Sequence, residues 1–330
     1  MRRGRLPKLP SLLQRKIYKT GQTRGADDDE IFQNRVSRSS TVLIPYPVWT
    51  RHFALEDAEQ MFGRGYIVLI SPAGYFGDLQ RSRQLDEEGL ELGQNALVFY
   101  ETRAQWMANN PEELGWRPAE SRVRPLGGSY VARISGTTAT DRGAKVVRGF
   151  ETTANKGAGI RVYEYADDNT IAQCRVQLEA LFWRCGDSLA LSVGNGMTPE
   201  EATVRREAIL NECRELGLLD LERLKNGRVL NSRGLPTCPL CLEEISSEGF
   251  FSRVEQAEGR EVLDLTITQV SLFHVEELRM GVFNHCPYNV GWGHHHCNVV
   301  AKDAGIGQTL EWMRAVLMRN SAAGQIPITE

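Results

Sequence analysis

The sequence lacks any apolar run of about 18 residues, the length that a membrane-spanning helix requires. The segment before Asp27 is basic, but no apolar stretch follows it, so it does not have the pattern of a secretory signal. The chain also lacks a Walker loop, a dinucleotide-binding glycine motif and a nucleophile elbow. These absences exclude several large enzyme classes and predict a cytoplasmic protein with no membrane partner.

A large net charge is also absent, because 39 lysines and arginines stand against 42 acidic residues, which gives −3. Such a balance is not typical of nucleic-acid-binding proteins, but phosphate contacts need local positive charge rather than a positive total. The charge is uneven, since the segment before Asp27 carries lysines and arginines and no acidic residue. This segment is predicted to be either a solvated tail or an arm that lies along a phosphate backbone.

The seven cysteines do not form a disulfide framework, because their number is odd and their spacing is irregular. Cys174, Cys185 and Cys213 stand among apolar or helical residues and are predicted to be buried thiols. The other cysteines fall in the last third of the chain, which favours a reducing compartment and one metal site. With 330 residues, 41% of them hydrophobic, the chain has material for about two domains.

The order of predicted strands and helices favours an α+β fold with a mixed N-terminal domain, residues 1–225. Alternation and apolar runs predict strands at 41–49, 66–70, 96–100, 129–134, 145–151 and 160–165, and helices at 55–62, 170–183 and 198 to about 224. Thr198-Pro-Glu-Glu201 is a capping box that begins the last of these helices. The polar segment 226–236, with two glycines and a proline, is predicted to be a linker to a separate module, 237–330.

Five of the six histidines lie between positions 274 and 296, beside two pairs of residues with metal-ligand spacing. Cys238-Pro-Leu-Cys241 offers two thiolates from a tight turn, and His294-His-His-Cys297 offers a second pair at the same spacing. Two close pairs separated by a long segment are typical of a Cys₃His zinc site. The alternating run 261–272 predicts a β-hairpin between them. The alternatives are a redox pair, which lacks a thioredoxin-like context, and an incidental surface cluster.

Further polar residues surround this predicted zinc site. His274 ends the predicted strand, Asn289 precedes the second ligand pair, and Asn298 follows Cys297. This arrangement resembles the HNH, or ββα-metal, nucleases in their HNN variant, with a treble-clef zinc module. The resemblance implies that His274 is the general base, that Asn289 braces the loop before the helix, and that Asn298 is a ligand of a catalytic Mg²⁺ or Mn²⁺. It also implies that Cys238, Cys241, His294 and Cys297 bind a structural Zn²⁺.

One position departs from that pattern, because many members of the family carry an acidic metal ligand where this chain has Phe273. Either another carboxylate completes the Mg²⁺ site, or a different histidine is the base. The candidate carboxylates are Asp264, Glu276, Glu277 and Asp303. The rival base is His285, whose other interpretation is a residue that braces a loop.

The runs Gly291–Asp303 and Thr309–Met313 resemble the C-terminal module of some Type II restriction endonucleases, and the run Lys16–Gly25 resembles the BstXI-like group in particular. The resemblance implies a homodimer that cuts double-stranded DNA at a specific site such as an interrupted palindrome, with a cognate DNA methyltransferase as genetic partner. Residues 1–225 would then recognise the target and dimerise. Side chains there that can contact DNA are Arg122, Arg124, Arg133, Arg142, Lys145, Arg148, Lys156 and Arg161.

Two other functions remain open. The first is a zinc-dependent nucleic-acid-binding protein without catalysis, which the departure at Phe273 favours. The second is an HNH nuclease of the homing or modification-dependent type, which cleavage restricted to methylated DNA would reveal. A scaffold role explains least, because it does not require the polar residues around Asn289 and Asn298.

Overall fold

The chain forms two compact units in the computed structural model. The described residues are 6–18, 22–23, 36–121, 123, 125–132, 159–252, 268–278, 283–302 and 304–323. Unit 1 comprises Met1–Thr20 and Asp168–Glu330, and unit 2 comprises Gly21–Asp167. The division at Asp168 differs from the boundary at 226–236 that the sequence predicted. None of the described helices is long and apolar enough to cross a membrane.

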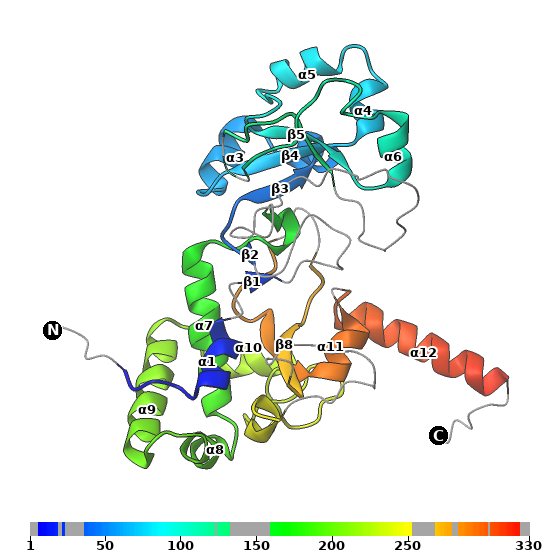
Figure 1. Cartoon of the computed structure of the whole chain (residues 1–330). Coiled ribbons are helices and arrows are strands. Elements are labelled where there is room, and N and C mark those ends of the chain that lie inside the picture. Colours follow the sequence, from blue (N-terminus) through cyan, green and yellow to red (C-terminus); the bar gives the residue numbers. More distant parts are fainter. Residues whose placement is uncertain are drawn as a thin grey trace, which may run out of the picture. The chain divides into compact units, whose positions relative to one another are not determined.

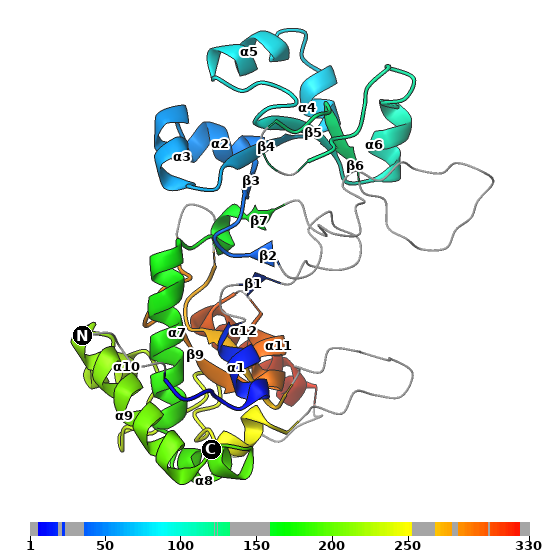
Figure 2. The ribbon, with the colours of Figure 1, turned by 60° about the vertical axis from the view of Figure 1, so that its left-hand side comes forward.

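Unit 2 is built on a five-stranded parallel sheet with the strand order β6-β5-β4-β3-β7. The strands are β3 (Val42–Pro45), β4 (Tyr66–Ile70), β5 (Ala96–Tyr100), β6 (Tyr130–Ala132) and β7 (Ile160–Arg161) (Figure 2). Nearly all side chains of β4 and β5 are buried, as expected for parallel strands that are covered on both faces. A separate antiparallel pair joins β1 (Gln22–Thr23) to β2 (Val36–Ser37).

Short helices connect the parallel strands. They are α2 (Tyr46–His52), α3 (Leu55–Met61), α4 (Pro72–Phe76), α5 (Arg81–Glu87) and α6 (Arg103–Ala108). The strand predicted at 41–49 is shorter, because a helix with proline in its first turn begins directly after Pro45. The strand predicted at 160–165 is shortened in the same way by the 3₁₀ helix η2 (Val162–Glu164). The strand predicted at 145–151 lies outside the described residues.

Unit 1 is mainly helical, and its long helix α7 lies beside α9 (Figure 1). Its helices are α1 (Ser11–Tyr18), α7 (Asp168–Trp183), α8 (Ser188–Gly194), α9 (Pro199–Glu215), α10 (Leu221–Asn226), α11 (His295–Ala301) and α12 (Ile306–Ala322). The capping box of Thr198 and Glu201 begins α9 as predicted. The helix does not reach Leu224, however, because Gly217 adopts a left-handed conformation with φ 67° and ends it.

Within the basic N-terminal segment, Ser11–Tyr18 form the amphipathic helix α1, which packs against α7. Leu13 and Ile17 are buried in the core of unit 1, and the buried Lys16 donates a hydrogen bond to Thr268. Arg15 faces solvent on the opposite side. This helix is therefore not a solvated tail, since its apolar face stabilises the fold of unit 1.

The antiparallel hairpin of β8 (Val270–His274) and β9 (Val290–His294) packs directly on α7. The Trp292 ring lies 4.9 Å from that of Phe250 in the 3₁₀ helix η3 (Ser247–Phe250), and Phe250 lies 5.1 Å from Phe182 on α7. Trp292 Nε1 also donates to the Leu178 carbonyl at 2.8 Å. The region predicted to be a separate module thus shares one aromatic core with α7.

The predicted linker 226–236 belongs to the same core. Val229 and Leu230 are buried within it, and the Arg184 guanidinium donates two hydrogen bonds to the Gly234 carbonyl. The glycines and the proline of this segment lie in packed turns. Such turns have the same amino-acid composition as a flexible linker, so composition alone does not distinguish the two. The fold remains a mixture of helices and sheet as predicted, but the division of unit 1 at 226–236 does not appear in its packing.

Candidate active site and metal centre

A tight turn brings the first pair of predicted metal ligands together. The Leu242 N–H donates to the Cys238 carbonyl and the Cys238 N–H donates to the Glu243 carbonyl, both at 2.8 Å. Leu242 closes the turn with φ 65°. Cys238 is buried, whereas Cys241 is exposed at the edge of the turn.

The second pair lies where the hairpin meets a helix. His294 is the last residue of β9 and the N-cap of α11, and Cys297 lies in the first turn of that helix. The His295 N–H donates to the Gln269 carbonyl at 2.7 Å, which fixes the start of α11 beside the start of β8. This junction directs both side chains toward the turn of Cys238 and Cys241.

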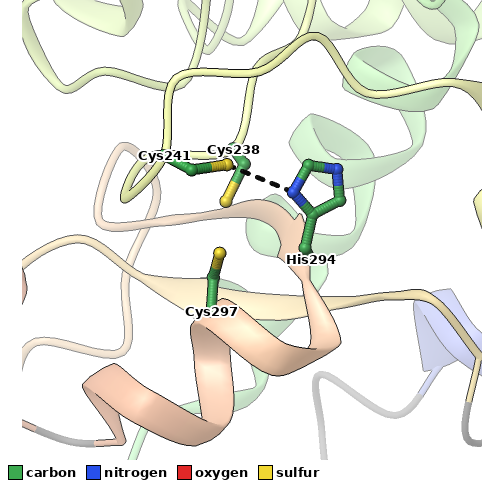
Figure 3. A group of neighbouring side chains, drawn as sticks. All are labelled: Cys238, Cys241, His294 and Cys297. Carbon is green, nitrogen blue, oxygen red and sulfur yellow. Dashed lines mark hydrogen bonds between the residues drawn. The ribbon is translucent and has the colours of Figure 1, made fainter. Parts of the chain in front are cut away.

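The four predicted ligands converge on one point (Figure 3). One ligand atom from each of Cys238, Cys241, His294 and Cys297 lies within 4.8 Å of all the others. Cys241 Sγ and His294 Nδ1 are 3.3 Å apart. Within the described part of the chain, no other group of three or more cysteine, histidine or carboxylate side chains converges in this way. The cluster could hold a metal ion, and its set of three sulfurs and one nitrogen fits tetrahedral zinc.

Burial and close contact make the thiols of the cluster harder to ionise. Burial, followed by the neighbouring Cys238 and Cys241, raises the pKa of the Cys297 thiol. Burial also raises the pKa of Cys241. Burial, followed by the nearby His296, lowers the pKa of His294, which keeps its ring neutral and able to coordinate. Thiols that disfavour each other's ionisation become stable thiolates when a dication lies between them.

The two histidines that the sequence offered as alternative bases are hydrogen-bonded to each other. His274 Nε2 lies 3.0 Å from His285 Nδ1, and the rings meet edge to face with their centres 5.2 Å apart. His274 is the last residue of β8, opposite Val290 of β9. Both rings are buried, with 8% of His274 and none of His285 exposed. The two side chains that the sequence offered as alternative bases therefore form one hydrogen-bonded pair.

The Asn289 side chain makes hydrogen bonds to two parts of the segment between β8 and β9. Its side-chain oxygen accepts a hydrogen bond from the Glu276 N–H at 2.6 Å. Its amide nitrogen donates to the Asn284 carbonyl at 2.6 Å. One buried side chain thus connects the end of β8 with the segment that carries His285.

The predicted ligands of a catalytic divalent ion are only partly described. Asn298 is half-buried on α11, Glu276 is exposed, and Glu277 is half-buried. Asp264 and Asp303 lie outside the described residues. The structure gives a reason for the departure at Phe273: its ring is fully buried, and a Cβ on Gly293 of the paired strand would lie 2.6 Å from it. Phe273 therefore packs in the hairpin core.

Most of the predicted DNA contacts cannot be placed. Arg122, Arg124, Arg133, Arg142, Lys145, Arg148 and Lys156 lie outside the described residues. Arg161 is described, and its guanidinium pairs with Glu164 at 2.8 Å and stacks on the Tyr163 ring. It is therefore already engaged within unit 2.

Two residues that support the site were missed at the level of sequence. The fully buried Gln177 on α7 accepts a hydrogen bond from the Tyr288 N–H at 2.8 Å and donates to the Leu218 carbonyl at 2.7 Å. Tyr288, with φ 69°, donates its hydroxyl to the Gly217 carbonyl at 2.6 Å. The sequence did contain a signal for Gln177, because it stands between Cys174 and Leu178 on the buried face of a helix. A buried polar side chain at such a position needs hydrogen-bond partners.

Comparisons with known proteins give one family match and one weak structural likeness. The model of a family described as BstXI restriction endonuclease matches residues 15–295. One solved structure, titled a crystal structure of a type II restriction endonuclease, is similar at 15% identity and a TM-score of 0.28. That match covers 48% of this chain and 57% of the other, so the chain spans little more than half the length of that relative. No curated protein matches the sequence.

Proposed function

The chain belongs to the BstXI restriction endonuclease family, and on this premise we propose that it is a site-specific endonuclease that hydrolyses both strands of double-stranded DNA. The observation that carries the proposal is the family match over residues 15–295. That range includes the hydrogen-bonded pair of His274 and His285 and three of the four clustered metal ligands.

We propose that His274 is the general base that activates water. A base must be neutral near physiological pH and must lie within reach of water, and an imidazole meets the first condition. His274 meets the second better than His285, because 8% of the residue His274 is exposed and His285 is fully buried. Asn289 maintains the position of the ring by tying the residues after β8 to the loop before β9.

The family implies a catalytic Mg²⁺, or Mn²⁺, for this chemistry. When bound, such an ion stabilises the charge that develops on the phosphate and on the departing oxygen. Asn298 would help to hold it, together with a carboxylate from Asp264, Glu276, Glu277 or Asp303. Phe273 is buried in the hairpin core and does not contribute.

We further propose that Cys238, Cys241, His294 and Cys297 hold a structural Zn²⁺. Its role would be to fix the turn at 238–241 against the junction of β9 and α11, because so short a hairpin and helix have little core of their own. The donor set, the convergence within 4.8 Å and the lowered pKa of His294 support this assignment.

The remaining parts of the proposal concern recognition and assembly. Unit 2, with its parallel sheet, would choose the target site, and unit 1 would cut. Cleavage of both strands by one active site per chain favours a homodimer with twofold symmetry. A cognate methyltransferase would protect the host DNA in the cytoplasm.

The burial of Phe273 favours one second candidate, a zinc-dependent DNA-binding protein without catalysis. Incubation with a plasmid of known sequence in Mg²⁺, Mn²⁺, Ca²⁺ or EDTA separates the two. Discrete fragments in Mg²⁺ or Mn²⁺, with ends that map to one sequence, are expected. DNA binding without cleavage in any divalent ion would favour the second candidate. Cleavage that requires methylated DNA would indicate a modification-dependent enzyme.

A further inference from the structure

We propose that Arg223 binds a phosphate of the DNA backbone close to the loop that carries His285, and that Tyr288 holds the guanidinium in place for this contact. The inference rests on the proposed nuclease function, which makes DNA the substrate. It gives unit 1 a substrate contact of its own, whereas the DNA contacts predicted from the sequence all belong to unit 2.

The Arg223 guanidinium lies over the ring of Tyr288, 4.0 Å from its centre. Stacking holds the flat group on the face of the ring but uses none of its five N–H donors. Within the residues that the structure describes, the side chain makes no hydrogen bond and no ion pair. Because Arg223 is also exposed, its donors are available to an anion from solution.

Other described arginines that lie over aromatic rings already have polar partners. They are Arg81, which pairs with Asp78, Arg161, which pairs with Glu164, and Arg175, which donates to the Tyr18 carbonyl. Arg223 differs from them, since stacking is its side chain's one contact of this kind in the described part of the chain.

The acidic residues next to Arg223 are engaged elsewhere. The Asp220 carboxylate caps α10 and accepts the backbone N–H groups of Glu222 and Arg223. The Glu222 carboxylate pairs with Lys225 at 2.8 Å. Neither carboxylate therefore neutralises the guanidinium by a direct ion pair.

The ring of Tyr288 is fixed from several sides. Its hydroxyl donates to the Gly217 carbonyl at 2.6 Å and accepts from the Asp220 N–H at 3.2 Å. Its backbone N–H donates to Gln177 at 2.8 Å. Its φ of 69° is uncommon for a bulky residue, and such strain persists only where the surroundings hold it, often at ligand-binding positions. The guanidinium thus rests on a rigid support.

This support belongs to the same loop as His285. Tyr288 stands directly before Asn289, which ties that loop to the end of β8. Burial raises the pKa of the Cys286 thiol, and the positive charge of Arg223 opposes this rise, so the guanidinium lies close to the residue after His285. We therefore expect the bound phosphate to lie within a few nucleotides of the cleaved bond.

An anion of this kind suits the group. The planar fork of an arginine matches two oxygens of a phosphate, and a fork that is already held in place loses less freedom when it binds. A phosphate contact adds affinity without reading the base sequence, and each one steepens the salt dependence of binding by about 0.9 in the logarithmic slope. That slope gives the proposal its measurable signature.

Binding titrations of the full-length, zinc-loaded protein in Ca²⁺ test the contact, with a duplex that carries the mapped site and an unrelated duplex. Arg223→Gln should weaken binding to both about 10-fold and should reduce the salt slope by about 0.9, whereas Arg223→Lys should keep the slope. The control is Arg233→Gln, because the exposed Arg233 already pairs with Glu244. It should leave the slope unchanged.

A weaker affinity with an unaltered slope in Arg223→Gln would mean a merely structural role and would overturn the inference, as would an unaltered affinity. Loss of binding to the mapped site alone would indicate base reading and would overturn it too. If the unaltered protein bound neither duplex, the proposed function itself would fail.

Neutral methylphosphonates, placed one at a time around the cut, locate the phosphate. For the unaltered protein, one position near the cut should weaken binding about 10-fold, and the same replacement should cost Arg223→Gln little, because the partner is already lost. Equal losses in the two proteins at every position would show that Arg223 contacts none of these phosphates.

Discussion

Nε2 of His274 lies 3.0 Å from Nδ1 of His285, across a separation of 11 residues in the chain. The pair joins the end of strand β8 to the loop that precedes β9. A single hydrogen bond therefore connects the two residues that the sequence offered as alternative bases.

Replacement of His274 should remove catalysis without unfolding the protein. His274→Ala is expected to lower the single-turnover cleavage rate about 10²- to 10⁴-fold, because the general base is lost. Zinc content and DNA affinity should stay unchanged. Rapid-quench cleavage assays, metal analysis and fluorescence anisotropy measure the three quantities.

The matched control is His52→Ala, which removes an exposed histidine from α2 of unit 2. It should cut DNA at the rate of the unaltered protein. If His274→Ala also cut near that rate, the base would have to be sought elsewhere, first at His285.

Loss of one metal ligand should destabilise all of unit 1. In Cys238→Ala, the cluster would have one donor fewer, and the hairpin that depends on it shares its core with α7. We expect zinc to be lost and unit 1 to unfold at a lower temperature. Metal analysis and near-ultraviolet circular dichroism detect these changes, since Trp292 and Trp183 are both buried there.

The cysteine for comparison is Cys213, which is fully buried on α9 and lies outside the metal cluster. Cys213→Ala should keep a full complement of zinc even if the small cavity lowers its stability. Stoichiometric zinc in Cys238→Ala would remove this residue from the ligand set.

Gln177 should contribute to stability through both ends of its amide. Gln177→Leu leaves the Tyr288 N–H and the Leu218 carbonyl without this partner, and each buried group left unsatisfied costs about 1–3 kcal/mol. Urea denaturation measures the loss in the free energy of unfolding. Cleavage should also slow, because Tyr288 adjoins Asn289 in the loop that carries His285.

Gln173 lies one turn earlier on the same helix and is half-buried, so Gln173→Leu provides the same substitution without this connection. Its effect on unfolding should be small. Equal losses in the two variants would mean that the hydrogen bonds of Gln177 add nothing specific.

The carboxyl group of Asp187 should make the free energy of unfolding of unit 1 fall in acid. Burial alone would raise the pKa of Asp187, but hydrogen bonds from the Ser246 hydroxyl and the Ser247 N–H outweigh it and hold the pKa below its ordinary value. The folded state then binds this proton less readily than the unfolded state. The stabilisation is complete above the unfolded pKa of about 3.9 and is lost as the pH falls through the folded pKa.

Denaturation curves between neutral pH and the acid limit of solubility should therefore show a smaller acid loss for Asp187→Asn than for the unaltered protein. Glu222→Gln, at an exposed position on α10, should keep the original profile. Identical slopes for the Asp187 variant and the unaltered protein would show that the carboxylate is not linked to folding.

Features that depend on neighbours in sequence were predictable. The two ligand pairs Cys238/Cys241 and His294/Cys297 were predicted from their spacing, and the structure brings them together. The capping box at Thr198 and the buried strand Tyr66–Ile70 also follow from local rules about helix ends and apolar runs.

Features that depend on the path of the chain were not predictable. The contact of His274 with His285 requires a particular course of the loop 275–289, which no periodicity encodes. The division into units was not predicted, because the sequence suggested that α7 buries only one face, as an amphipathic helix does. In the structure, residues 177–183 of α7 are all buried, so this helix packs against other elements on more than one face. The composition of 226–236 predicted a flexible linker, although the segment forms packed turns. Packed turns and flexible linkers are both rich in glycine, proline and polar residues.

The aromatic contacts between α7 and the hairpin have a practical consequence for protein engineering. A segment that folds on its own can be moved into another protein as a portable domain. If residues 237–330 were excised, they would lose the α7 surface that covers Trp292 and Phe250. The apolar surface exposed in this way would be prone to aggregation. A transplantable version would have to carry α7 through α12 together with α1, whose Leu13 and Ile17 lie in the same core.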